Sequence, residues 1–539
     1  MTTDLDIARS VRPRPIADVA ADLGVPAEAL VPYGHDKAKI RLGRPPKPSG
    51  RLILVSAITP TAAGEGKTTT SVALAQGIGK LGLKGCVALR EPSLGPVMGL
   101  KGGAAGGGRA QVIPMEDINL HFTGDFHAIT AANNLLAALI DNHLQQGNVL
   151  KIEARTIAWK RVMDMNDRAL RDILVGLGGK SQGVPREAGF NITAASEIMA
   201  ILCLSEDFED LQRRLGAILV GQEIGTGKGI YARDLEAQGS MAVLLKDAIY
   251  PNLVQTLEGT PAIIHGGPFA NIAHGCNSVL ATKTALELAD YVVTEAGFGF
   301  DLGAEKFLHI KCRSAGLAPH AVVIVATIRA LKSHGGVAKA DLGKEDVEAV
   351  RRGLPNLTRH LQTAHRFGLR PVVALNHFVA DTDAEVAVVT EACEQREVPV
   401  EICRGWELGG AGAVDLARRV VEVASSGEAF FHPLYEVTQP LKEKVMTLAR
   451  DVYGADDVVW SARAEQDLKR IQKLGLEGLP VCMAKTPVSL TDEPRDGGLP
   501  KRFVLNVREV EVAAGAGFLI PITGDVMRMP GLGKRPAAL

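Results

Sequence analysis

The segment from Thr59 to Thr70, TPTAAGEGKTTT, constrains the fold most strongly because of what lies on either side of it. An apolar run from Leu52 to Ile58 precedes it, and a helix-like stretch from Ser71 to Leu81 follows. A strand, a glycine-containing turn and then a helix is the layout of a phosphate-binding loop. The segment therefore predicts a nucleotide site at the carboxyl end of a strand.

The residue types in this loop suit phosphate. Small residues let backbone N–H groups approach phosphate oxygens, and the amides at the helix N-terminus point toward the same anion. Lys67 adds a positive charge that reaches the terminal phosphates, and Thr68 offers a hydroxyl to Mg²⁺. The G-x-x-x-x-G-K-[ST] template is not fully met, because Thr61 stands at its first glycine. The alternative, an ordinary glycine turn with a surface lysine, leaves the consecutive threonines unexplained.

Charge and cysteine content exclude several classes of protein. The 60 basic and 61 acidic side chains leave a net charge of -1, so no overall field favours nucleic acid or an anionic membrane. Seven scattered cysteines without a C-x-x-C pair indicate reduced thiols and argue against disulfides or a zinc site. The N-terminus has no apolar signal segment, and the longest apolar stretch, Ala321 to Ile328, is too short to cross a bilayer. We therefore expect a cytoplasmic protein that binds neither nucleic acid nor membranes.

Strand-like and helix-like segments alternate along much of the chain, which is typical of a parallel sheet covered by helices. At 539 residues, about three or four domains are expected. The predicted fold class is α/β, with a mostly parallel sheet domain of the P-loop NTPase type, a helical insertion and a second α/β domain. The predicted boundaries are an N-terminal arm over 1–50, the nucleotide-binding domain over 51–129 and 260–350, the mostly helical insertion over 130–259, and the second α/β domain over 351–539.

Most of the predicted strands end in polar, glycine-bearing loops. In open α/β sheets, ligands bind beyond the carboxyl ends of the strands, so these loops are expected to meet at one crevice. Each polar residue taken singly is equally well explained as a surface or capping residue. The candidates are Arg90, His265, Glu295, Asp301, Lys306 and Arg329.

A glycine-rich segment, Gly99 to Pro114, follows the second predicted strand. So many glycines cost backbone entropy on folding, which favours a loop that a ligand approaches closely over a flexible linker. His121, Asp125 and His127 come next, on a predicted turn. They are too few for a metal site, so we interpret them as substrate-orienting groups or as a satisfied polar turn.

Two aromatic residues occupy equivalent positions in the C-terminal part of the chain. Phe378 follows the predicted strand from Pro371 to Leu375, and Trp406 follows the one from Val398 to Ile402. Aromatic residues make up only 4% of the chain, so a stacking slot for a flat heterocycle is one interpretation. Core packing is the better interpretation from these residues alone.

A series of motifs along the chain resembles formate tetrahydrofolate ligases, in the order of that family. The motifs are TPTAAGEGKTTT, GLKGGAAGGGRAQVIPMEDINLHFTGD, HGGPFANIAHGCNS, EAGFGFDLGAEKF, VATIRALKSHGG and MPGLGKRPAA. Departures are few: Ala62 and Gly533 replace usual prolines, Arg109 a usual tyrosine and Phe300 a usual alanine. Arg109 places a cation beside the glycine-rich segment, which bears on loop conformation or affinity and not on the reaction class. Thr61 is the residue that the family itself has at the template's first glycine.

The resemblance implies an activity, cofactors and partners. The activity is ATP-dependent ligation of formate to N10 of tetrahydrofolate, giving 10-formyltetrahydrofolate, ADP and phosphate through formyl phosphate. The cofactors are Mg²⁺ with ATP and an activating monovalent cation, K⁺ or NH₄⁺. Polyglutamylated tetrahydrofolate as substrate, a monofunctional chain and a homotetramer are also implied.

Site residues are carried over by motif. Lys67 and Arg90 are the catalytic residues, and Arg90 holds formate and formyl phosphate. Phe378 and Trp406 sandwich the pterin, which reverses the preference for core packing. The residues that bind ATP are Thr59, Pro60, Thr61, Ala62, Ala63, Gly64, Glu65, Gly66, Lys67 and Thr68. The substrate-orienting group, or the base that takes the amine proton, is Asp125, His127 or His265, and the resemblance does not choose among them.

Two other classes of function stand as alternatives. A P-loop ATPase or GTPase with a regulatory or chaperone role explains the phosphate loop, but neither the glycine-rich segment nor the paired aromatic loops. An interaction protein that kept the fold and lost the activity is disfavoured by the presence of Lys67, Arg90 and Trp406.

Overall fold

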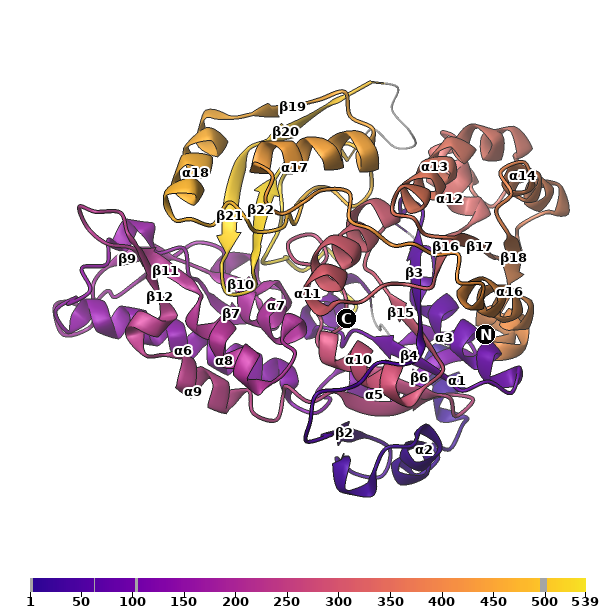
Figure 1. The fold of residues 1–539 in the computed structure, drawn as a ribbon, viewed down its shortest axis with the longest axis horizontal. Coiled ribbons are helices and arrows are strands. Elements are labelled where there is room, and N and C mark those ends of the chain that lie inside the picture. The colour runs from indigo at the N-terminus through magenta and orange to yellow at the C-terminus, as the bar shows by residue number, and fades with distance from the viewer. Residues whose placement is uncertain (1–2, 63, 102–104, 495–501) are drawn as a thin grey trace.

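The computed structural model describes residues 3–62, 64–101, 105–494 and 502–539, and a 12-stranded sheet lies at its centre (Figure 1). The strand order is β1-β2-β13-β14-β4-β15-β3-β16-β17-β18, with β6 paired to β13 and β5 to β6. Neighbours from β14 to β18 are parallel, and the other pairs are antiparallel. The strands are β1 (Leu30–Pro32), β2 (Ala38–Ile40), β3 (Arg51–Ala57), β4 (Gly85–Leu89), β5 (Gly106–Gly107), β6 (Ala110–Ile113), β13 (Asn252–Thr256), β14 (Pro261–Ile264), β15 (Tyr291–Glu295), β16 (Ala321–Ala326), β17 (Pro371–Asn376) and β18 (Val400–Cys403).

The central strand β3 is buried on both faces. Leu52 and Leu54 belong to one hydrophobic cluster, and Ile53 and Val55 belong to another. Successive side chains of a strand point to opposite faces, so a continuous apolar run suits a sheet that is covered on both sides. The expectation of an α/β fold with a large, mostly parallel sheet is confirmed.

Helices cover the two faces of the sheet. Residues of α3 and α16 pack into the cluster with Ile53, and residues of α10, α12, α13 and α14 pack into the cluster with Leu52. The long helix α13 illustrates why helices pack on the sheet. Its apolar residues Val350, Leu357 and Leu361 recur at helical spacing and form one buried face. The bounds are α3 (Lys67–Lys80), α10 (Val279–Leu288), α12 (Ile328–His334), α13 (Val347–Arg366), α14 (Asp383–Glu394) and α16 (Val414–Ser425).

The boundary predicted at residue 351 lies within α13, and strands on both sides of it belong to the central sheet. β17 pairs with β16 in parallel, from Pro371 opposite Val322 to Leu375 opposite Ala326, and β18 extends the same sheet. Strands that are buried along their whole length, such as β16 and β17, need both faces covered, which a shared sheet provides. β17 and β18, which follow residue 351, are therefore part of the central sheet.

A separate hydrophobic cluster forms later in the chain, around Tyr453 and Leu505. Its helices and paired strands lie together at one side of the molecule in Figure 1. They are α17 (Leu441–Thr447), α18 (Ala462–Lys473), β19 (Asp457–Trp460) with β20 (Val504–Val507), and β21 (Glu509–Ala513) with β22 (Phe518–Ile522).

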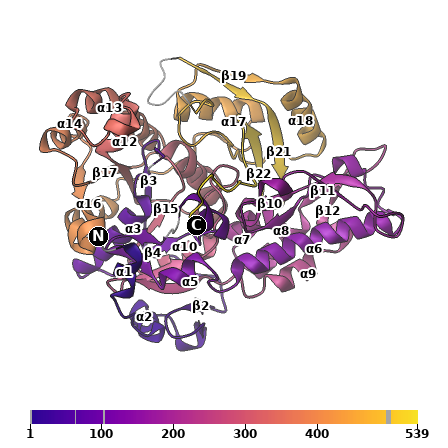
Figure 2. The same cartoon turned by 180° about the vertical axis from the view of Figure 1, so that it is seen from behind.

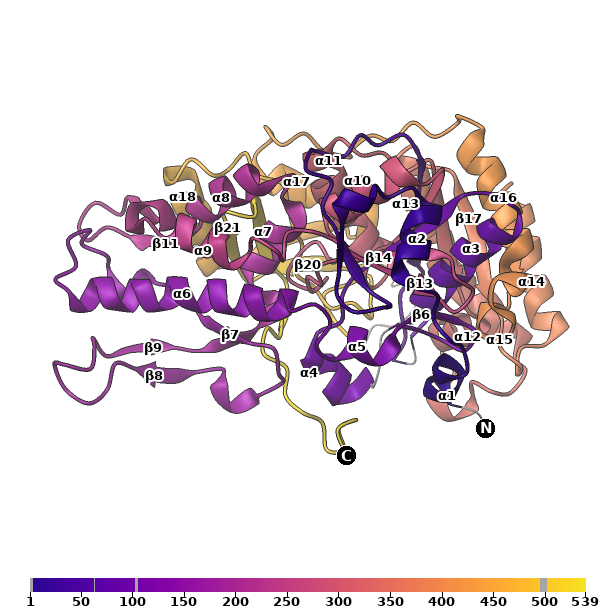
Figure 3. The same ribbon diagram turned by 90° about the horizontal axis from the view of Figure 1, so that it is seen from below.

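The region from 130 to 259 forms a lobe beside the sheet, where the sequence predicts a helical insertion (Figures 2 and 3). Besides helices it contains three two-stranded sheets, and β13 within it belongs to the central sheet. Its elements are α6 (Asp125–Gln145), α7 (Glu197–Leu204), α8 (Phe208–Gly216), α9 (Gln238–Leu244), β7 (Arg161–Met163) with β10 (Phe190–Ile192), β8 (Ile173–Val175) with β9 (Arg186–Ala188), and β11 (Leu219–Gln222) with β12 (Gly229–Tyr231).

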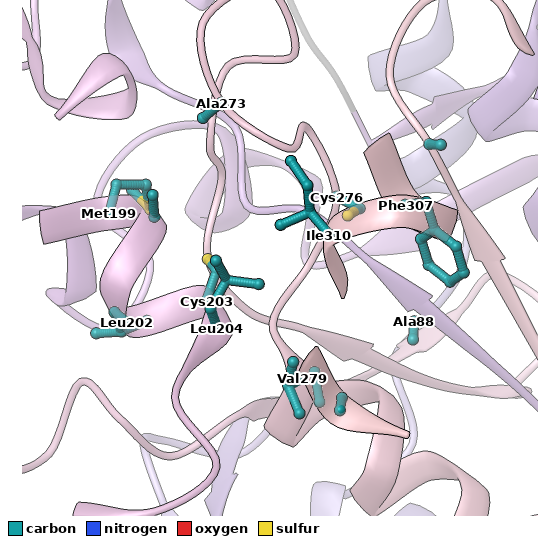
Figure 4. Packing of buried hydrophobic residues seen from close by; sticks show 14 of the residues in the cluster. Ala88, Met199, Leu202, Cys203, Leu204, Ala273, Cys276, Val279, Phe307 and Ile310 are labelled. Atoms are coloured by element: carbon teal, nitrogen blue, oxygen red, sulfur yellow. The ribbon is translucent and has the colours of Figure 1, made fainter. Parts of the chain in front are cut away.

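Helix α7 joins this lobe to the central core. Met199 and Cys203 of α7 share a hydrophobic cluster with Ala273 and Ile310 (Figure 4). Gly266, in the loop after β14, has a φ of 66°, and a Cβ there would collide with Cys203 Sγ. Only glycine allows the loop and the helix to approach this closely.

The two ends of the chain both reach the glycine-rich segment. The N-terminal arm contains α1 (Asp4–Arg9) and α2 (Ile16–Leu23), and α1 lies beside β6 (Figures 1 and 3). At the other end, Ala537 N donates to Gly99 O at 2.6 Å. Both ends therefore line a region that the sequence singles out for function.

Candidate active site

The loop after β3 shows the predicted order of strand, turn and helix, and α3 begins at Lys67. Gly64 and Gly66 have φ values of 75° and 74°, which favour glycine. A Cβ at Gly66 would also collide with Asn376 Nδ2. The predicted ATP-binding residue Ala63 lies outside the described residues.

Thr59, at the start of the loop, is fully buried and held by α13. Its N–H donates to Asn356 Oδ1 at 3.2 Å, and Asn356 Nδ2 donates to its hydroxyl at 2.9 Å. His360 Nε2 lies 3.1 Å from the same hydroxyl. Burial lowers the pKa of His360 to about 4, so the ring is neutral near pH 7. The loop thus starts from a fixed point anchored by uncharged groups.

Glu65 points into the protein. Its Oε1 accepts hydrogen bonds from Thr61 N at 2.8 Å and Thr61 Oγ1 at 2.9 Å, and its Oε2 accepts one from Thr327 Oγ1 at 2.6 Å. Its backbone oxygen accepts a bond from Asn376 Nδ2 at 3.0 Å. The carboxylate therefore ties the turn together, and the hydroxyl of Thr61 accounts for a threonine where the template has glycine.

Glu295 connects the ends of neighbouring strands. It closes β15, its side chain is 7% exposed, and its Oε1 lies 4.0 Å from Arg90 Nη2. Its Oε2 accepts a hydrogen bond from Thr68 Oγ1 at 2.9 Å. The structure thus brings Arg90 and Glu295 to the first turn of α3, which starts with Lys67.

Arg90 has one hydrogen bond that holds its side chain and one N–H group without a partner among the described residues. Its Nη1 donates to Pro268 O at 3.3 Å. Its Nε is buried and has no hydrogen-bond partner among the described residues. A Cβ at Gly297 would lie 3.1 and 3.2 Å from the two Nη atoms, so glycine leaves room for the guanidinium. A buried donor without a partner is costly, so this geometry suits an anionic ligand.

His265 directly follows β14. It is fully buried, with Nδ1 2.6 Å from Ser278 Oγ and Nε2 2.6 Å from Ala248 O. Nε2 therefore donates to the carbonyl and Nδ1 accepts from the hydroxyl. Burial lowers the pKa of His265 to about 4, which fits this neutral form. Both ring nitrogens are occupied by protein partners.

Asp125 and His127 sit in the first turn of α6 and face different ways. The Asp125 carboxylate is buried against Lys39 Nζ, at 2.8 and 3.0 Å, and accepts a third bond from Asn252 Nδ2 at 2.8 Å. His127 is exposed. Asp125 and His265 are thus both buried inside the protein, whereas His127 faces solvent.

Asp301 and Lys306, which the sequence also predicts to lie at the crevice, both bind other groups of the protein. Asp301 Oδ2 lies 3.1 Å from Lys485 Nζ, and both side chains are buried. Lys306 is fully buried and donates to Ala270 O at 2.6 Å. These residues hold the loops after β14 and β15.

Phe378 and Trp406 lie outside the hydrophobic clusters of the described residues. The side chain of Trp406 stands on α15 (Gly405–Leu408), and the residue is 54% exposed. Arg329 Cζ lies 4.6 Å from the centroid of the Phe378 ring, and Phe378 N donates to Asp381 Oδ2 at 2.8 Å. Arg329 therefore stacks on one face of Phe378.

Asn376 and Asp4 contact residues of the site but are not among the candidates from the sequence. Asn376, which holds the backbone of Glu65, directly follows the predicted strand from Pro371 to Leu375, and polar residues at strand ends are the kind of signal that identifies Arg90 and Glu295. No local pattern predicts the contact of Asp4 with the glycine-rich segment. Gly108, whose N donates to Asp4 Oδ1, lies 104 positions later in the sequence.

Metal and membrane features can be assessed for the described ranges. Within residues 3–62, 64–101, 105–494 and 502–539, no group of three or more His, Cys, Asp or Glu side chains could hold a metal ion. In the same part of the chain, no helix has the length and apolar character to cross a membrane.

The sequence matches known proteins from end to end. The family model described as formate–tetrahydrofolate ligase matches residues 2–539. A formate–tetrahydrofolate ligase of Cereibacter sphaeroides is 58% identical over 540 residues, covering 99% of this chain and 97% of the relative. Relatives of the same name from Rhizobium rhizogenes and Paracoccus denitrificans are 58% and 57% identical, covering 99% and 100% of this chain and 96% and 98% of their own. The chain belongs to the formate–tetrahydrofolate ligase family.

Proposed function

We propose that this chain joins formate to tetrahydrofolate in an ATP-dependent reaction that gives 10-formyltetrahydrofolate, ADP and phosphate through formyl phosphate. Membership of the family supports the ligation of formate to tetrahydrofolate. The observation that carries the finer mechanism is the cluster of Arg90, Glu295 and Thr68 at the N-terminus of α3. It combines a cation, a carboxylate and a hydroxyl where two anionic substrates have to meet.

Formate must first become a better electrophile. Its carboxylate is anionic and resonance-stabilised, and phosphorylation converts one oxygen into a leaving group. The carboxylate and the γ-phosphate repel each other, so positive groups have to hold them in line. We assign Lys67 and the first amides of α3 to the phosphates and Arg90 to formate. The unpartnered Nε and a neighbouring Nη of Arg90 suit a planar carboxylate, which takes two parallel hydrogen bonds.

The residues present fit Mg²⁺ bound together with ATP. Thr68 Oγ1 and Glu295 Oε2, 2.9 Å apart, are oxygen ligands of the kind that Mg²⁺ takes. Mg²⁺ usually needs only one or two protein groups when phosphates supply the rest, which agrees with the lack of a larger ligand cluster in the described ranges. When bound, it neutralises charge on the transferred phosphoryl group.

Tetrahydrofolate then accepts the formyl group. We assign its pterin to Phe378 and Trp406, because neither ring belongs to a hydrophobic cluster of the described residues and Trp406 is largely exposed. The folate amine attacks the formyl carbon, and the carbonyl oxygen gains charge in a tetrahedral intermediate. Arg90 or a nearby backbone N–H stabilises that charge, with an effect on the order of 3 kcal/mol per well-placed donor.

The three candidates for orienting the substrate differ in their surroundings. His265 and Asp125 have internal partners, and we propose that they position the loop after β14 and the start of α6. His127 is exposed in the first turn of α6, so we keep it as the candidate that reaches the substrate. A His127→Gln variant with an unchanged pH profile of kcat would exclude it as the base.

Three other features of the proposal rest on the family resemblance alone, and a cytoplasmic location rests on the scattered cysteines. The three features are a homotetramer, activation by K⁺ or NH₄⁺ and polyglutamylated tetrahydrofolate as the preferred substrate. Light scattering on the purified protein tests the tetramer, and activity in K⁺, NH₄⁺ and Na⁺ buffers tests the cation.

Trapping the intermediate tests the proposed mechanism. With ATP, formate and hydroxylamine but without tetrahydrofolate, formyl phosphate should be captured as a hydroxamate, and ADP should form only when formate is present. ADP release that does not depend on formate would support a regulatory ATPase or GTPase. Absence of any turnover, even with tetrahydrofolate, would support an interaction protein.

A further inference from the structure

The N-terminal helix is connected to Trp406 by a short series of hydrogen bonds. Asp4 Oδ1 accepts a bond from Gly108 N at 2.9 Å. Gln111 Nε2 donates to Asp4 O at 2.9 Å and to Gly108 O at 2.8 Å. From the same turn, Arg109 N donates to Trp406 O at 2.8 Å. The turn between β5 and β6 is therefore held by Asp4 on one side and holds the Trp406 backbone on the other.

The glycines of this turn let the indole of Trp406 lie directly against it. A Cβ at Gly107 would lie 3.2 Å from Trp406 Cδ1, 3.3 Å from its Nε1 and 3.4 Å from Asp4 Oδ2. Gly108 has a φ of 56°, and a Cβ there would overlap Trp406 O. The edge of the indole thus contacts the turn, and more than half of Trp406 stays exposed to a ligand.

Helix α1 is capped at its start and paired with the protein at its end. Thr3 and Asp6 form reciprocal hydrogen bonds that cap its N-terminus. At its other end, Arg9 Nη2 lies 2.5 Å from Glu116 Oε1. The helix therefore contacts the segment after β6 at one end and the turn before it at the other.

We propose that Asp4 is a positioning residue for tetrahydrofolate, acting through the Gly107–Gly108 turn on Trp406. This inference rests on the proposed role of Trp406 in the pterin site. A tryptophan that is held before the ligand arrives loses less rotamer freedom when the ligand stacks on it. The N-terminal arm thereby becomes part of the folate site.

Three variants at the N-terminal arm test the proposal. Asp4→Ala should raise the Kd of tetrahydrofolate about five-fold, as expected for one additional side chain to be ordered on binding. The KM values of ATP and formate should not change. Asp4→Asn should keep most of the affinity, because its amide oxygen accepts the same bond from Gly108 N. Asp18→Ala, an exposed aspartate on α2, is the matched control and should bind like the wild type.

A double-mutant cycle separates this proposal from the proposed function. Trp406→Ala should weaken tetrahydrofolate binding, and adding Asp4→Ala to it should have no further effect on Kd. If Trp406→Ala binds tetrahydrofolate normally, the pterin assignment fails. If Trp406→Ala weakens binding and Asp4→Ala does not, only the role of Asp4 is refuted. Additive effects on Kd in the double variant would also refute it. So would an Asp4→Ala variant whose KM for ATP rises as much as its Kd for tetrahydrofolate.

Discussion

Replacement of Glu65 tests whether this carboxylate holds the loop after β3 together. Glu65→Ala removes two hydrogen bonds from Thr61 and one from Thr327. Hydrogen bonds to a charged group contribute about 1.5–3 kcal/mol each, and they are not additive. Because Thr61 is only half-buried, water replaces part of the loss. We therefore expect the ordered loop to be destabilised by about 3 kcal/mol.

This loss should appear in ATP binding. When a ligand binds only one conformation, its apparent affinity falls with the population of that conformation. A destabilisation of about 3 kcal/mol therefore raises the Kd of a non-hydrolysable ATP analogue by about 10-fold to 100-fold, depending on how stable the loop is in the wild type. Glu65→Gln keeps the shape and the acceptor for Thr61, so its effect should be smaller. Calorimetric titration measures both, with tetrahydrofolate binding as the internal control.

Three outcomes would refute the reasoning about Glu65. Unchanged ATP affinity in Glu65→Ala would show that the loop is held by other contacts. Tighter ATP binding in either variant would show that the carboxylate faces the phosphates and repels them. A similar loss of tetrahydrofolate affinity would indicate general unfolding instead of a local effect.

Three further predictions concern catalysis, stability and pH. Lys67→Ala should reduce hydroxamate formation from formate and ATP by at least about 100-fold, comparable to removal of one strong electrostatic group, and full activity would contradict its assignment. Lys39→Met leaves the Asp125 carboxylate buried without its cation, because these side chains are 3% and 2% exposed, and should cost about 3–5 kcal/mol of stability. Asp125→Asn in that background should restore part of the lost Tm, and a Tm unaffected by Lys39→Met would contradict the prediction. Burial lowers the pKa of His360 to about 4, from about 6.5 in the unfolded chain. Its contribution to stability is therefore present above pH 6.5 and is lost as the pH falls toward 4, by about 3 kcal/mol in total. The Tm of His360→Gln should consequently fall less than that of the wild type over this range, and parallel Tm curves would exclude the neutral buried ring.

Much of the sheet is predictable from sequence because its signals are local. The apolar run before Thr59 becomes β3, and the helical pattern after it becomes α3. Arg90 and Glu295 are recognisable because they stand where apolar runs end, and parallel strands bring such ends to one edge. The pairing of β17 with β16 is not recognisable in this way, because an apolar run does not specify which strand lies beside it.

The sequence by itself determined the strand, loop and helix around Lys67, since turn chemistry and hydrophobic periodicity act over a few residues. Tertiary structure alone decided what the polar side chains do. Glu65 turns inward because Thr327 lies beside it, and Asp125 is buried because Lys39, 86 positions earlier, pairs with it. Asp4 reaches Gly108 only after the arm has folded back on the sheet. A buried charge or donor needs a partner, and packing of distant segments chooses that partner.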